Sequence, residues 1–122
     1  MRQRRKRRQS LREDHGDAVR IETLHRIAKV FEELLNQTDK AIETERRVLE
    51  IDPSNAAALE ALDRMYHYER NFAALIEVLR KRLDAVVEDV SARLDLMLRI
   101  ARAYEQELRD TSEAIAAFRA IL

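Results

Sequence analysis

The strongest constraint on the fold of this chain is an internal repeat, in which residues 19–49 recur without a gap as residues 92–122. About a third of the aligned positions are identical, and most of the other apolar positions keep an apolar residue. The identical pairs include Arg20 with Arg93, Arg26 with Arg99, Ile27 with Ile100, Ala28 with Ala101, Ala41 with Ala114, and Ile42 with Ile115. An ungapped self-match of this length indicates a repeat architecture, in which each unit buries its apolar face against a neighbour.

The composition favours an all-α fold for these repeats. The chain has 122 residues, 46% hydrophobic and 38% charged, with one Gly, one Pro and no Cys. Abundant Ala, Leu, Glu and Arg lose little rotamer freedom in a helix, whereas long loops and β-turns need more Gly and Pro. Without Cys, disulfides, thiolate catalysis and Cys-based zinc sites are excluded.

Apolar residues recur at spacings of three and four, which predicts six helices. Their expected ranges are about 18–35, 38–51, 54–69, 72–86, 90–108 and 113–122. Gly16 and Asp17 are expected to separate the first helix from the residues before it. Asp52 and Pro53 are expected to end the second helix, with Pro53 at the first position of the third. In the first helix the apolar stripe is Ile21, Leu24, Ile27, Ala28, Phe31, Leu34 and Leu35.

Equivalent positions Ile27, Leu62 and Ile100 are separated by 35 and 38 residues, close to the period of about 34 of a helix-turn-helix repeat. The pattern Leu24, Ile27-Ala28, Phe31, Ala41-Ile42, Asp52-Pro53 resembles a tetratricopeptide repeat, and Met97, Ile100-Ala101, Tyr104, Ala114-Ile115, Phe118 resembles another. The middle unit is similar but degenerate. This resemblance implies a right-handed α-solenoid of about three antiparallel helix-turn-helix repeats, at residues 18–53, 54–89 and 90–122. Residues 18–122 would form one repeat domain, a fragment of a longer protein.

Three departures from the family pattern lead to expectations about geometry. Both outer repeats carry one extra residue in the turn within the repeat, and four extra residues between the second and third repeats predict a longer fourth helix. Asp63 replaces the usual small residue of the middle repeat, and Glu45 stands at an aromatic position of the first. Small residues at Ala28, Ala41, Ala101 and Ala114 are expected where paired helices approach closely.

Residues 1–17 form a basic N-terminal arm. Residues 1–12 hold seven basic side chains and no acidic one, which leaves 16 basic against 23 acidic in residues 13–122, a net charge of −7. Three interpretations stay open: a solvated or marginally helical arm, the end of a preceding repeat, or a nucleic-acid-binding segment. The residues of the last interpretation are Arg2, Arg4, Arg5, Lys6, Arg7 and Arg8.

In tetratricopeptide-like stacks, the first helix of each pair lines a concave groove, and this resemblance places a basic row there. The expected partner-binding residues are Arg26, Lys29, Arg64, His67, Tyr68, Arg99 and Arg102. A cationic strip attracts acidic segments. Alternatively, these are ordinary solvated charges paired with neighbouring glutamates. The two-carboxylate clamp of the family is not expected, because Asp95 stands where a carboxylate would bind.

No catalytic, metal or cofactor site is expected. Glu22 and His25 have the spacing of half of a di-iron site, but no second copy exists. Asp63 and His67 are better explained as a surface ion pair on one helix than as metal ligands.

We therefore expect a protein-interaction scaffold rather than an enzyme, with a protein or acidic peptide as partner. Nucleic-acid binding through the arm is the alternative, together with self-association through the C-terminal repeat, where Ile115, Phe118 and Ile121 are left uncovered. The sequence has no secretory leader pattern and no stretch of about 18 apolar residues, so no membrane contact is expected. A cytoplasmic location is compatible with the lack of Cys.

Overall fold

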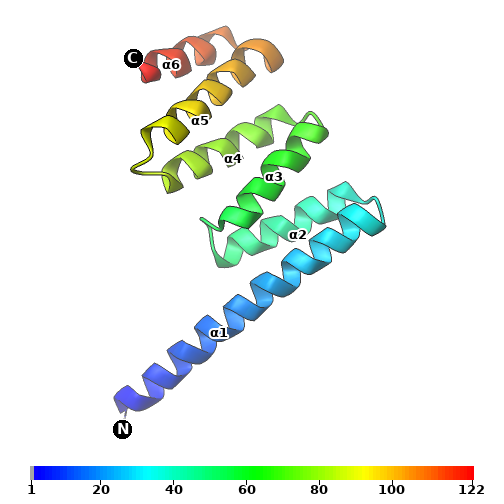
Figure 1. Cartoon of the computed structure of the whole chain (residues 1–122), viewed down its shortest axis with the longest axis vertical. Helices are drawn as coiled ribbons and strands as arrows, with labels where there is room; N and C mark the ends of the chain where they lie inside the picture. The colour runs from blue at the N-terminus through cyan, green and yellow to red at the C-terminus, as the bar shows by residue number, and fades with distance from the viewer. Residues whose placement is uncertain (1) are drawn as a thin grey trace. The chain divides into compact units, whose positions relative to one another are not determined.

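The computed structural model describes the backbone of residues 2–122 and the side chains of residues 15–122. Every regular element in this part of the chain is helical, as predicted (Figure 1). The elements are α1 (Arg2–Lys29), η1 (Val30–Leu34), α2 (Thr38–Ile51), α3 (Ala56–Tyr68), α4 (Phe72–Ala85), α5 (Val90–Arg102), η2 (Ala103–Glu107) and α6 (Thr111–Ile121). Here η1 and η2 are π-helical turns. Helices α1 and α2, α3 and α4, and α5 and α6 pack as antiparallel pairs, which confirms the helix-turn-helix architecture.

The chain divides into two compact units. Unit 1 is Met1–Pro53 and contains the first hairpin, and unit 2 is Ser54–Leu122 and contains the second and third hairpins. Within unit 2, α4 packs against α5, so that these two hairpins are direct neighbours.

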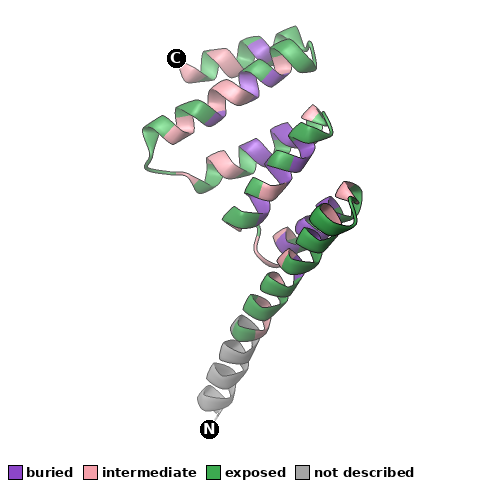
Figure 2. Ribbon diagram, turned by 45° about the vertical axis from the view of Figure 1, so that its right-hand side comes forward, coloured by how far each residue is buried: buried purple, intermediate pink, exposed green. Residues whose placement is uncertain are grey.

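Small residues allow the paired helices to approach closely, as predicted. Ala28 and Ala41 are buried between α1 and α2, and Ala101 and Ala114 are buried in the third hairpin. The core of the middle hairpin contains larger side chains, and Leu59, Leu62 and Met65 are almost completely inaccessible. Figure 2 shows buried residues in each hairpin.

The turn between α3 and α4 ends α3 with a left-handed residue. Arg70 has φ 59°, and the amide of Asn71 donates to the carbonyl of Tyr66 at 2.9 Å. The Arg70 amide donates to His67 at 3.1 Å, completing the double hydrogen bond that closes many helix C-termini. The Asn71 side chain then accepts from the Ala74 amide and caps α4.

In the outer hairpins the predicted extra residue lies inside the last helical turn rather than in a longer loop. The Leu35 amide donates to the Val30 carbonyl at 3.1 Å, five residues back, and Leu108 donates to Ala103 at 3.0 Å. These bonds define the π-helical turns η1 and η2. After them, Asn36 and Arg109 take positive φ angles of 51° and 52°, as Arg70 does in the middle hairpin.

The prediction of a longer fourth helix is wrong. Helix α4 has 14 residues, the same number as α2, and the extra residues lie in the link Val86–Asp89. Val86 is extended, with φ −101° and ψ 98°. The guanidinium of Arg93 donates to the carbonyls of Leu83 and Val86, and the Asp89 side chain caps α5. Both contacts stabilise the end of α4 and the start of α5.

Two predicted helix boundaries also differ. Helix α1 continues through Gly16 from Arg2, so the predicted start near Ala18 is wrong. One glycine costs a helix only about 1 kcal/mol relative to Ala, which good helix formers around it offset. Pro53 precedes α3, which begins at Ala56, because the side chain of Asn55 caps that helix by accepting from the Ala58 amide.

Three members of the expected α1 stripe are exposed. Ile27 is 42% exposed, Leu34 76% and Leu35 54%. Helix α2 covers the side of α1 that carries Leu24 and Ala28. The π-helical turn widens the last turn, and therefore shifts the direction of the residues that follow from the regular α-helical pattern.

Candidate partner-binding surface

Unit 2 places four of the seven predicted groove residues around two adjoining pockets. His67, Arg99 and Arg102 line the first pocket, and Arg64, His67 and Arg99 line the second. Helix α3 supplies Arg64 and His67, and α5 supplies Arg99 and Arg102. Helices α3 and α5 are the first helices of their hairpins, as the predicted groove requires.

The other predicted residues lie elsewhere. Tyr68 is on α3 but is 78% exposed and does not line these pockets. Arg26 and Lys29 belong to unit 1, where both are exposed and Arg26 lies 3.7 Å from Glu22. A basic row that runs through all three hairpins therefore stays a prediction. The six basic residues predicted to contact nucleic acid, Arg2 to Arg8, lie outside the described side chains.

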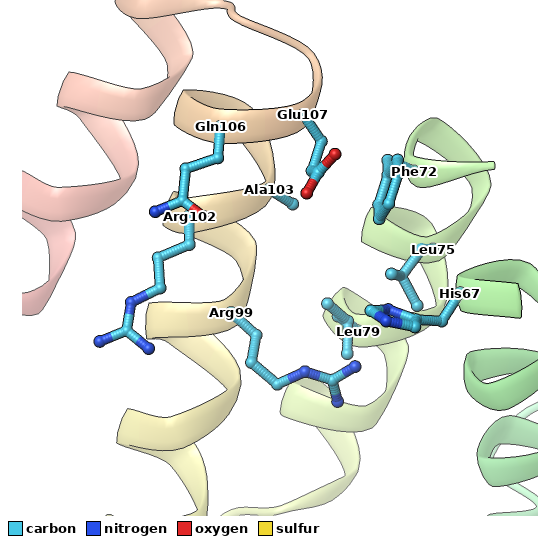
Figure 3. Close-up of a pocket in the computed structure, with 9 residues that line it drawn as sticks. All are labelled: His67, Phe72, Leu75, Leu79, Arg99, Arg102, Ala103, Gln106 and Glu107. Atoms are coloured by element: carbon cyan, nitrogen blue, oxygen red, sulfur yellow. The ribbon is translucent and has the colours of Figure 1, made fainter. Parts of the chain in front are cut away.

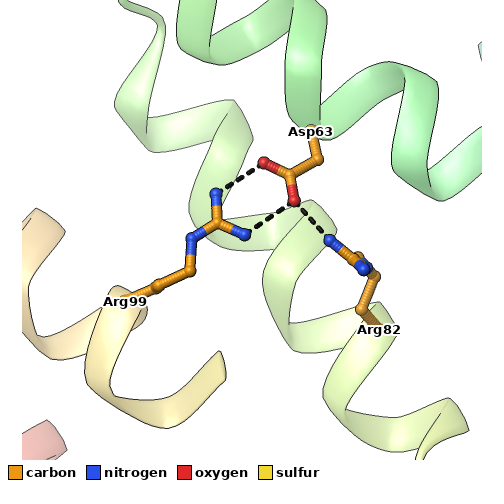
Figure 4. A network of polar contacts seen from close by, with 3 residues as sticks. All are labelled: Asp63, Arg82 and Arg99. Atoms are coloured by element: carbon orange, nitrogen blue, oxygen red, sulfur yellow. Dashed lines mark hydrogen bonds and ion pairs between the residues drawn. The ribbon is translucent and has the colours of Figure 1, made fainter. Parts of the chain in front are cut away.

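Asp63 is the centre of an ionic network that joins three helices of unit 2 (Figure 4). The Arg99 guanidinium of α5 donates from Nη2 to Oδ1 at 2.7 Å and from Nη1 to Oδ2 at 2.8 Å. Arg82 of α4 donates to the same Oδ2. Asp63 itself is only 7% exposed. Such a two-pronged arginine–carboxylate contact is strong and fixes geometry.

This network changes the protonation behaviour of both partners. Burial would raise the pKa of Asp63, but the hydrogen bonds and positive charges of Arg99 and Arg82 outweigh it and lower this pKa. The hydrogen bond to Asp63 raises the pKa of Arg99, against the opposing effect of burial. Consequently Asp63 is ionised at neutral pH. Its carboxylate largely neutralises the positive charge of Arg99.

The predicted ion pair between Asp63 and His67 is wrong. Asp63 binds two arginines from the following helices, while the His67 ring packs edge-on against Phe72, with centroids 5.9 Å apart. Sequence reasoning missed Arg82 completely. A signal was present: an acidic residue at a position reserved for small packing residues needs cations from the helices that cover it.

Next to this network lies an apolar pocket between α4 and the α5–η2 segment (Figure 3). Phe72, Leu75 and Leu79 form one wall, Ala103 lies opposite, and the volume is about 170 Å³. Sites for small molecules usually have about 300–1,000 Å³, so the pocket suits a single side chain better than a whole ligand. Its polar rim consists of His67, Arg99, Arg102, Gln106 and Glu107.

The rim has one cation that is available to a partner. Glu107 lies 3.5 Å from Arg70, and Arg99 is bound to Asp63. Arg102 is exposed and, among the residues whose side chains the structure describes, forms no ion pair. In Figure 3 its guanidinium points away from the pocket wall of α4, along the outer side of α5.

Unit 1 holds a second buried acidic residue, Glu45, at the aromatic position noted in the sequence. It is 4% exposed, and Nδ1 of His25 lies 3.0 Å from Oε1 and 2.9 Å from Oε2. Oε1 has the His25 contact, whereas Oε2 has no hydrogen-bond donor of good geometry. His25 thus serves packing in the hairpin and is directed at α2, not at Glu22.

The described residues contain no group of three or more His, Cys, Asp or Glu side chains that could hold a metal ion. Within the same part of the chain, no helix is long and apolar enough to span a lipid bilayer.

Antiparallel helix pairs of this length, joined by tight turns and packed side by side within unit 2, define the class of α-helical hairpin repeats. Two tetratricopeptide repeat family models match the chain, one over residues 58–94 and the other over residues 95–122. Together they cover more than half of the sequence, and the chain belongs to the tetratricopeptide repeat family. A search of curated proteins found no significant match.

Proposed function

We propose that this protein is an interaction module that binds an extended segment of a partner protein on the α3–α5 face of unit 2. Tetratricopeptide repeats typically mediate protein–protein interactions. The observation that carries the proposal is the side-chain-sized apolar pocket with the available cation Arg102 on its rim.

These two features favour a particular partner chemistry. An apolar side chain would enter between Leu79 and Ala103, and a carboxylate beside it would pair with Arg102. Arg64, which lines the adjoining pocket, belongs to this proposal as a source of a favourable field rather than as a direct contact. We therefore expect the partner segment to be acidic with an isolated aliphatic residue.

A binding experiment tests this proposal. A random peptide library is selected against the full chain, and the enriched peptides are measured by fluorescence anisotropy with the wild type, Arg102→Glu and Arg47→Glu. Arg47 is an exposed arginine of α2 and provides the matched control. Arg102→Glu should weaken binding at least about tenfold, which corresponds to about 1.4 kcal/mol. Equal affinity of all three proteins would refute the assignment to this surface.

The composition of residues 1–12 favours nucleic-acid binding as a second candidate. Seven basic side chains without an acidic one would attract phosphates independently of sequence. Binding to a labelled duplex should then weaken steeply with salt and disappear when residues 2–12 are deleted. Binding that survives the deletion would exclude the arm as its origin.

A further inference from the structure

Three contacts join α5–η2 of the third hairpin to α4 of the second hairpin. Arg93 donates from Nη1 to the Leu83 carbonyl at 2.8 Å, at the end of α4. The Tyr104 hydroxyl accepts from Nη2 of Arg80 at 2.9 Å, and this guanidinium lies 5.9 Å from the Tyr104 ring centre. Ala103 is buried and faces α4 across the pocket. The surface of α5–η2 that contacts α4, called here the receiving surface, thus consists of Arg93, Ala103 and Tyr104.

The same receiving surface is repeated in unit 1, because α1–η1 and α5–η2 align without a gap. Arg20, Val30 and Phe31 correspond to Arg93, Ala103 and Tyr104. The Arg20 side chain is 65% exposed, with only a 3.5 Å contact to Asp17. Val30 is 45% exposed, whereas Ala103 is 7% exposed.

The same difference in exposure between units 1 and 2 is found for Ile27 and Ile100. The two residues occupy the same repeat position, yet Ile27 is 42% exposed and Ile100 only 6%. Helix α1 therefore presents an apolar and basic surface of the kind that α5 uses to hold a preceding helix.

Helix α6 repeats the surface of α4 on which Leu79 lines the pocket with Ala103 and Arg80 contacts Tyr104. Aligning Ala114-Ile115 with Leu75-Ile76 places Ile115, Phe118 and Arg119 at the positions of Ile76, Leu79 and Arg80. Ile76 is 4% exposed, and Ile115 is 46% exposed. The two surfaces that form the α4–α5 contact thus each occur a second time in the chain, one on α1–η1 and the other on α6.

We propose that α6 of one molecule docks on α1–η1 of a second copy of this chain, in the manner in which α4 docks on α5. Arg119 then approaches the ring of Phe31 in the second copy, as Arg80 approaches Tyr104, and joins Lys40, which lies 5.7 Å from the centre of that ring within its own chain. Arg20 of the second copy reaches the end of α6, as Arg93 reaches the end of α4.

This contact joins two different surfaces, so it is heterologous. A dimer keeps one unused α1 surface and one unused α6 surface, so further copies add head to tail until a ring closes. The inference is independent of the partner-binding surface on α3 and α5, because it uses neither the apolar pocket nor Arg102.

Two complementary variants test it with the full chain. Val30→Glu places a charge on the α1 surface, and Ile115→Glu places one on the α6 surface. Both side chains are nearly half exposed, so the hairpins should tolerate the change. Val87→Glu is the matched control, at a 76% exposed position in the link between α4 and α5. Circular dichroism reports whether each variant keeps its helices.

Sedimentation velocity over an about hundredfold range of concentration measures the association. The wild type and Val87→Glu should grow in mean mass with concentration, and each interface variant alone should stay a monomer. A mixture of Val30→Glu and Ile115→Glu should stop at a dimer, because it combines one intact α6 with one intact α1. A wild type that stays monomeric overturns the proposal.

Two further outcomes also count against it. Self-association of Ile115→Glu alone would indicate a symmetric contact between α1 helices, and a monomeric mixture would exclude the α1–α6 pairing. Should Val30→Glu lose helicity, Arg20→Ala replaces it, with the exposed Arg47→Ala as control. Arg20→Ala should weaken the association of the wild-type chain, and an unchanged association would contradict the role given to Arg20.

Discussion

Arg99 of α5 holds Asp63 of α3 through two parallel hydrogen bonds of 2.7 and 2.8 Å, across the boundary between the second and third hairpins. Because Arg82 joins from α4, a single carboxylate binds three helices together. The residues that form this network are therefore the first targets for mutagenesis.

Asp63→Ala should lower the stability of unit 2. The substitution leaves two guanidinium groups without their carboxylate, although their side chains are 28% and 40% exposed and can be partly hydrated. We expect a loss of about 2 kcal/mol in the free energy of unfolding, less than for a fully buried pair. Urea denaturation measures it, with the exposed Asp95→Ala on α5 as control. Equal stability of both variants would show that the network contributes nothing.

The contribution of Asp63 should disappear in acid. Its pKa in the folded protein lies below the ordinary value of 3.8, so its stabilising effect is complete above that value and is lost as the pH falls through the lower, folded pKa. The pKa of Arg99 is raised above its ordinary value, so its part would be lost only in strongly alkaline solution. The difference in unfolding free energy between wild type and Asp63→Asn should therefore shrink from about pH 5 downwards. A difference that stays constant to pH 2 would contradict this origin.

Arg109→Gly should stabilise the third hairpin. Arg109 has φ 52°, a left-handed conformation that costs a residue with a side chain roughly 1 kcal/mol but costs Gly little. We expect a gain of about 0.5–1 kcal/mol, measured as a higher midpoint of thermal unfolding. Asn36→Gly is the internal comparison: its φ is 51°, but Asn tolerates this region, so its gain should be smaller. A lower midpoint for Arg109→Gly would mean that the arginine side chain itself stabilises the turn.

Glu45→Leu should be neutral or stabilising by about 1 kcal/mol. The carboxylate is 4% exposed and one of its oxygens lacks a good donor, so an apolar side chain of similar size removes a desolvation cost. Chemical denaturation tests it, and Glu43→Leu, at an exposed position of the same helix, controls for the change in helix propensity. A marked destabilisation would show that the contact with His25 contributes more than the burial of Glu45 costs.

The sequence was a good guide to the fold where packing depends on local periodicity. Ala28, Ala41, Ala101 and Ala114 were expected between paired helices, and all four are buried. The sequence also showed the extra residue of each outer hairpin. It did not show that this residue would widen a helical turn. Boundaries were less predictable: a single Gly16 does not stop a helix, and Arg93 holds the link after α4 through contacts that no spacing rule reveals.

For the candidate site, register placed Arg64, His67, Arg99 and Arg102 on the first helices of their hairpins, but it could not tell which of these side chains pair with an acidic residue inside the protein. Arg99 is bound to Asp63, which leaves Arg102 as the available cation. The pocket wall of Phe72, Leu75 and Leu79 comes from α4, a helix that the groove prediction did not include. Long-range pairing and pocket shape depend on how helices pack, which a single sequence does not specify.

Asp63 has a consequence for the order in which the hairpins assemble. At its position the first and third hairpins have Ala28 and Ala101, which would accept many apolar neighbours equally well. The buried carboxylate favours a following hairpin with an arginine at the position of Arg99, because a hairpin without it would leave the carboxylate with Arg82 alone. One ionic contact thus restricts which kind of hairpin can follow the middle one, although the first hairpin also has an arginine, Arg26, at the position of Arg99.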